Sequence, residues 1–128
     1  MYVVLAWTTV ILAFLMLLPY IMKKLGKSAG FIRYSGYKKA LKFLRTVHKP
    51  MGAVVLVTGL AHGYLALGGT IILNTNGTLL WTILLVTAVV GGIYFRTRNK
   101  SLFPVHKFLA LLVVVAFLYH YLSPGPVL

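Results

Sequence analysis

Residues 46–67 read TVHKPMGAVVLVTGLAHGYLAL and decide the fold, because this stretch is long and apolar enough to cross a membrane yet contains two histidines. His48 and His62 are 14 positions apart. On a helix this spacing equals two heptads, so both imidazoles lie on one face, about 21 Å apart along the axis. One histidine is therefore expected near each surface of the hydrocarbon layer.

A second stretch repeats this arrangement. Residues 102–122 read LFPVHKFLALLVVVAFLYHYL, in which His106 and His120 are again 14 positions apart. The Val-His-Lys sequence at 47–49 recurs at 105–107. The two halves of the chain are thus predicted to be copies related by an axis along the membrane normal.

Two further apolar stretches complete the predicted architecture, an all-α transmembrane four-helix bundle. Of the 128 residues, 60% are apolar and 10% charged, whereas a soluble domain has roughly 25% charged residues. The first stretch lacks the basic region and cleavage site of a signal peptide and is predicted to be a span. We expect one membrane domain over residues 1–128, with helices at about 2–22, 46–67, 78–95 and 102–122.

The composition also excludes several kinds of chemistry. The sequence has no Cys, which excludes disulfides, thiolate zinc sites, iron–sulfur clusters and covalently attached c-type haem. It has no Asp or Glu, which excludes a carboxylate acid–base pair, a calcium site and internal salt bridges. Its high apolar content excludes a disordered basic tail. Chemistry must therefore use His, Lys, Arg, Tyr, hydroxyls, the backbone or a cofactor.

The positive charges predict the topology. Nine of the 13 lie between Lys23 and Lys49, and the other four between Arg96 and Lys107. The positive-inside rule places both basic connections in the cytoplasm and both termini outside. The second and fourth helices then run parallel, so His48 is level with His106 and His62 with His120. We expect an integral protein of a prokaryotic plasma membrane.

The basic segment 31–45 has apolar residues at helical spacing (Tyr37, Leu41 and Leu44) and predicts an amphipathic helix running into the second span. Its charged face is either simply solvated or a dock for anionic lipid or an acidic partner protein. Both interpretations are open at this point.

The Asn-Gly-Thr sequence at residues 76–78 lies on the predicted outer side. It matches a glycosylation acceptor site. Asn-Gly is first a turn signal, so a turn at this point is the simpler interpretation.

Four intramembrane histidines in one register point to a bound metal, although hydrogen bonding between helices is the plainer alternative. Two imidazoles per level, with no third donor type, are too few for a good zinc site. Haem iron needs only two protein ligands, because the porphyrin supplies four nitrogens. Small residues would leave room for a flat macrocycle or simply allow close helix packing; they are Gly52, Gly59 and Gly63 in the second helix and Gly91 and Gly92 in the third.

The chain resembles the haem-binding core of membrane b-type dihaem cytochromes. Similar cores form the N-terminal half of cytochrome b and the transmembrane domain of ferric reductases and NADPH oxidases. The resemblance implies two haem b groups with iron ligated by His48/His106 and His62/His120, and electron transfer across the membrane. The Pro-Glu-Trp-Tyr motif of cytochrome b is absent.

Cations beside the inner pair are candidates to bind haem propionates: Arg45, Lys49 and Lys107. The alternative is that they extend to the membrane surface as snorkelling side chains. Expected partners are membrane lipid and other redox subunits or an electron carrier docking at the basic cytoplasmic face, and no nucleic acid.

Other functions are compatible with the same residues. The chain could be a quinone-linked anchor subunit of an oxidoreductase rather than a stand-alone enzyme, and quinone binding is left open. A function of another class is a His-lined proton or ion pathway without haem. Against it, the residues between the histidine levels are mainly Val, Leu and Ala, with Thr58 as the hydroxyl.

Overall fold

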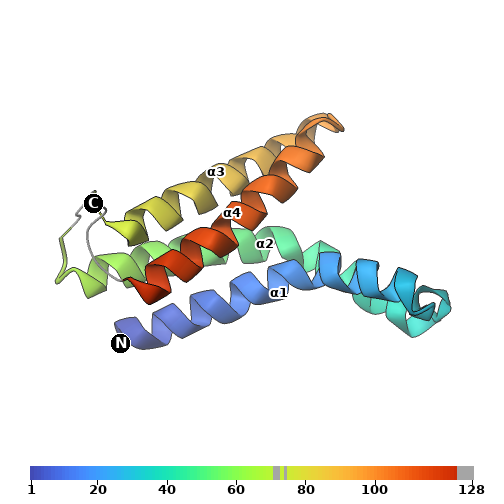
Figure 1. The fold of residues 1–128 in the computed structure, drawn as a ribbon, viewed down its shortest axis with the longest axis horizontal. Coiled ribbons are helices and arrows are strands. Elements are labelled where there is room, and N and C mark those ends of the chain that lie inside the picture. Colours follow the sequence, from blue (N-terminus) through green and yellow to red (C-terminus); the bar gives the residue numbers. More distant parts are fainter. Residues whose placement is uncertain (71–72, 74, 124–128) are drawn as a thin grey trace. The chain divides into compact units, whose positions relative to one another are not determined.

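The computed structural model describes residues 1–70, 73 and 75–123. Its elements are α1 (Tyr2–Ser28), the 3-10 helix η1 (Phe31–Arg33), α2 (Ser35–Ala66), α3 (Asn76–Thr97) and α4 (Leu102–Leu122) (Figure 1). The all-α prediction is confirmed. Helix α2 begins well before the predicted span, because the basic amphipathic segment continues directly into it.

The chain divides into two compact units. The first comprises Met1 and Val3–Thr58, and the second comprises Tyr2 and Gly59–Leu128. Helix α2 contributes to both, since the division falls between Thr58 and Gly59. That residues 1–128 form one membrane domain stays a prediction.

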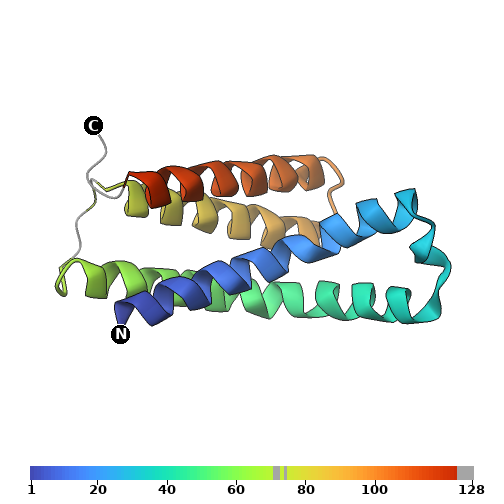
Figure 2. The same ribbon diagram turned by 60° about the horizontal axis from the view of Figure 1, so that its bottom comes forward.

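In the first unit, α1 and the beginning of α2 form an antiparallel hairpin (Figure 2). The hydroxyl oxygens of Thr9 and Thr58 are 2.9 Å apart and hydrogen-bonded. Near the turn, the Tyr37 hydroxyl donates to the carbonyl oxygen of Met22. The Tyr37 ring occupies the space beside Gly26, where an added Cβ would be 2.5 Å from Cε1. Gly26 therefore lets the two helices close on the tyrosine.

In the second unit, α3 and α4 pack against each other as an antiparallel pair (Figures 1 and 2). The Thr75 side chain caps α3 by accepting from the backbone N–H of Thr78 at 3.1 Å. At the other end, Arg98 adopts a left-handed conformation with φ 57° and donates its N–H to the carbonyl of Tyr94. These two caps fix where the pair begins and turns back.

Helices α1, α3 and α4 are each long and apolar enough to cross a membrane. Large apolar side chains are exposed along their faces, including Trp7, Phe14 and Phe108. Among the described residues, few apolar side chains are buried: Pro19, Leu41, Val55 and Ala116. So small a core would not hold a protein together in water, and the exposed apolar faces suit contact with lipid.

Helix α2 does not reach the same mean hydropathy as the other three helices. Its apolar half contains His48, Lys49, Pro50 and His62, which lower the average. The second predicted span is therefore helical, and its crossing of the membrane stays a prediction.

Candidate functional site

His106 on α4 is half-buried and hydrogen-bonds to the backbone of α3. Its Nδ1 is 2.9 Å from the carbonyl oxygen of Thr87. A carbonyl oxygen only accepts, so Nδ1–H donates and the lone pair of the neutral ring lies on Nε2. The hydroxyl of Thr87 donates within its own helix, to the carbonyl of Ile83 at 2.7 Å. It is thus the backbone of Thr87 that orients the imidazole.

Gly91 makes this contact possible. In an α-helix the carbonyl of one residue points toward the residue four positions later, so a side chain at position 91 would cover the carbonyl of Thr87. A Cβ added to Gly91 would be 2.8 Å from Cε1 and 2.9 Å from Nδ1 of His106. At the next position, Gly92, an added Cβ would meet nothing within 4 Å. The sequence leaves open whether these two glycines make room for a macrocycle or allow close helix packing, and in the structure Gly91 makes room for the imidazole ring of His106.

His120, near the other end of α4, is held by a side chain instead. Its Nδ1 is 3.0 Å from Oδ1 of Asn76. The Nδ2 of Asn76 donates to the carbonyl of Ser123, which leaves Oδ1 as the acceptor facing the histidine. His120 therefore also donates through Nδ1–H. A Cβ on Gly77 would be 3.1 Å from Cε1 of its ring, so this glycine, too, gives the imidazole room.

The same contacts correct both interpretations of residues 76–78. Asn76 is only 2% exposed, and both ends of its amide group are hydrogen-bonded. A glycan cannot be attached to that nitrogen in this structure. The turn interpretation is also wrong, because Asn76 and Gly77 lie in the first turn of α3, which Thr75 caps.

His62 belongs to the second unit and contacts the beginning of α1. Its Nδ1 is 3.0 Å from the carbonyl oxygen of Tyr2, and the two rings have centroids 6.3 Å apart. By the same reasoning, Nδ1–H donates here and Nε2 carries the lone pair.

The remaining predicted site residues are spread over both units. His48 lies half-buried on α2 in the first unit, with Arg45 and Lys49 exposed nearby. A Cβ on Gly52 would be 3.3 Å from Cε of Met16, so this glycine allows close helix packing. Gly59 is half-buried, and a Cβ on Gly63 would meet nothing within 4 Å. The Nζ atom of Lys107 lies 5.0 Å from the ring centroid of Phe103, one turn back along α4.

Three of the four histidines thus share one arrangement, in which Nδ1–H donates to an oxygen and Nε2 carries the lone pair. Sequence reasoning missed the residues that produce it: Tyr2, Asn76, Gly77 and Thr87. One signal was present, because Gly77 and Gly91 are 14 positions apart, as are His106 and His120. In an antiparallel pair, equal spacings bring each glycine to one histidine.

The described residues contain no cluster of three or more His, Cys, Asp or Glu side chains that could hold a metal ion. No protein-family model, curated protein or solved structure matches this chain. Functional inference therefore depends on the histidines, their spacing and their hydrogen bonds.

Proposed function

We propose that this protein transfers electrons across a membrane through two haem b groups, as a cytochrome b-type subunit of a redox complex. His48 and His106 would hold one haem at the cytoplasmic level, and His62 and His120 would hold the other at the outer level. The observation that carries the proposal is the shared Nδ1–H···O arrangement of His62, His106 and His120. Held by two imidazoles each, these haems would supply one-electron transfer in place of oxygen binding.

The donor set fits this group. An imidazole whose Nδ1–H is engaged by a carbonyl or amide oxygen is fixed in orientation and presents Nε2, made more basic, to a metal. Hydrogen bonding between helices, the alternative interpretation, explains the contacts of Nδ1. It does not explain the spacing of the four histidines. Sites that each supply two imidazoles suit a cofactor that brings four donors of its own.

The proposal requires α2 to be the fourth span, parallel to α4, with both termini outside. The lower hydropathy of α2 is compatible with this role, because the residues that lower it include both proposed ligands. Lys107, which follows His106 on α4, would neutralise a propionate at the cytoplasmic level. A quinone-linked anchor role would use the same haem ligands.

The deciding experiment is a redox-difference spectrum of the purified protein with pyridine haemochrome quantitation. We expect a b-type spectrum and two haems per chain. The matched control is the chain with all four histidines replaced by Ala, which should be colourless. A colourless wild-type protein, or haem retained by the fourfold variant, would contradict the proposal, and the former would favour a His-lined proton pathway.

A further inference from the structure

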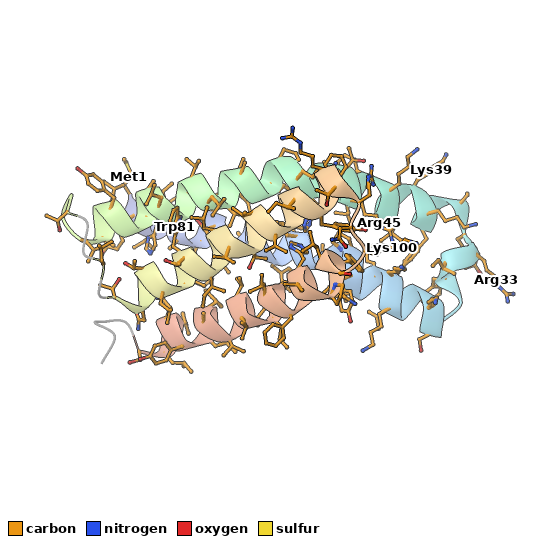
Figure 3. The ribbon with its side chains drawn as sticks, turned by 90° about the horizontal axis from the view of Figure 1, so that it is seen from above. Met1, Arg33, Lys39, Arg45, Trp81 and Lys100 are labelled. Atoms are coloured by element: carbon orange, nitrogen blue, oxygen red, sulfur yellow. The ribbon has the colours of Figure 1, made fainter. Side chains whose placement is uncertain are left out.

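A basic groove lies in the first unit, between α1, η1 and α2. Its volume is about 590 Å³. Five cationic side chains line it: Lys23, Lys38, Lys42, Arg45 and Lys49. Figure 3 shows Arg33 and Lys39 extending from the turn of the same hairpin, with Arg45 further along α2.

Four of these cations form one stripe on α2. Positions 38, 42, 45 and 49 follow helical spacing, so their side chains lie on the same face. Like charges three or four residues apart repel each other, and the sequence has no Asp or Glu to neutralise them. The groove therefore attracts an anion from outside the chain.

The hairpin contacts hold the stripe opposite α1. Tyr37 directly precedes Lys38 and is bonded to the carbonyl of Met22, which directly precedes Lys23. This bond, with the tyrosine ring seated on Gly26, brings Lys23 to the α2 stripe. The contacts within the hairpin therefore form the groove, and all of its lining residues belong to the first unit.

The surroundings indicate a lipid. Lys23 follows the apolar part of α1 directly, so the groove lies at the depth of the phospholipid headgroups. Leu41, which is 6% exposed, and the half-buried Ile32 give the groove an apolar lining beside its charges. The glycerol and acyl chains of a lipid would pack against this apolar lining. A soluble acidic protein would contact mainly the charged side chains.

We propose that this groove binds the phosphate headgroup of an anionic phospholipid. The test uses the full-length protein in phosphatidylcholine vesicles with a trace of spin-labelled phosphatidylglycerol or spin-labelled phosphatidylcholine. We expect a clear preference for phosphatidylglycerol. Lys38→Gln/Lys42→Gln/Arg45→Gln should reduce that preference about tenfold, because each cation near the membrane surface contributes up to a few-fold.

The matched control removes the same charge from the same hairpin without touching the groove. Lys24→Gln/Lys27→Gln/Lys39→Gln should keep the preference, because these exposed residues do not line the groove. Lys38→Arg/Lys42→Arg should also keep it. Equal losses in the two triple variants, or no preference in the wild type, would overturn the proposal, as would displacement of the lipid by polyglutamate.

A second measurement needs no variant. A photoactivatable phosphatidylglycerol should crosslink within residues 23–49 of the wild-type protein. Millimolar glycerol phosphate should leave most of the crosslink in place, because it lacks the acyl chains. Crosslinks found only outside residues 23–49, or abolished by glycerol phosphate, would contradict a lipid site.

Discussion

The imidazole of His106 lies against the backbone of Gly91 on the neighbouring helix, so closely that a Cβ at position 91 would be 2.8 Å from Cε1 of the ring. The same approach brings Nδ1 to 2.9 Å from the carbonyl of Thr87. The absence of a side chain at Gly91 therefore has two effects. It leaves room for the His106 ring, and it exposes the carbonyl oxygen of Thr87 that orients the ring. The position of His106, a proposed haem ligand, therefore depends on a glycine of the neighbouring helix.

Gly91→Ala should displace the His106 ring and break its bond to Thr87. Overpacking of this kind costs about 1–3 kcal/mol, and loss of the partner of a metal-ligating histidine lowers metal affinity about 10- to 100-fold. We expect a lower unfolding midpoint and loss of the cytoplasmic-level haem. Thermal unfolding of the protein in detergent and pyridine haemochrome quantitation measure the two effects.

The neighbouring glycine is a matched control. A Cβ on Gly92 meets nothing within 4 Å, so Gly92→Ala should leave both stability and haem content unchanged. If both variants behaved alike, the contact between Gly91 and His106 would not be what positions the histidine. Unfolding reports on the contact even if haem binding itself were disproved.

Asn76→Ala should weaken the outer haem in particular. The substitution leaves Nδ1–H of the half-buried His120 without its partner, and loss of such an orienting partner lowers metal affinity about 10- to 100-fold. Haem content should fall from two toward one per chain. Asn99→Ala is the control, because Asn99 is exposed and its side-chain Oδ1 accepts from the backbone N–H of Ser101, away from the histidines. Equal haem content in the two variants would refute a role for Asn76.

The helices could be predicted from sequence because each depends on local information. The run from Leu102 to Leu122 is uninterrupted and apolar, and α4 has those bounds. The amphipathic spacing of segment 31–45 predicts a helix that runs into the second span, and α2 is indeed continuous from Ser35. Phe31–Arg33 form the separate 3-10 helix η1. Hydropathy marks what can enter the membrane, whereas hydrogen bonding along the backbone decides where a helix begins.

The candidate histidines could also be predicted from local sequence, whereas the residues that hydrogen-bond to them could not. The spacing of His106 and His120 is a property of one helix. The partners Thr87 and Asn76 lie on another helix, and one acts through its backbone, which carries no sequence signal. Asn-Gly at 76–77 predicts a turn, but Thr75 caps α3 and these two residues form the first turn of that helix.

The topology can be tested directly, because the sequence contains no Cys and single cysteines can be introduced without background. Thr70 and Ser101 are both exposed and follow α2 and α3 respectively. With four spans and outer termini, a membrane-impermeant maleimide should label Thr70→Cys in intact cells and leave Ser101→Cys unlabelled. If α2 does not cross, the pattern reverses, because α3 would then run in the opposite direction.

The pairing of ligands can be tested by combining substitutions. If α2 and α4 run parallel, as proposed, His62 is level with His120 and His48 with His106. Each single His→Ala variant should therefore lose one haem. His62→Ala/His120→Ala should lose no more than either single variant, because both changes affect the same iron.

His62→Ala/His106→Ala, in contrast, removes one ligand from each level and should lose both haems. Antiparallel helices would reverse these outcomes, since His62 would then be level with His106. Haem counted per chain by pyridine haemochrome in the two double variants distinguishes the arrangements. The two double variants are matched, because each lacks two imidazoles. They differ only in whether both imidazoles come from one level of the membrane or from two.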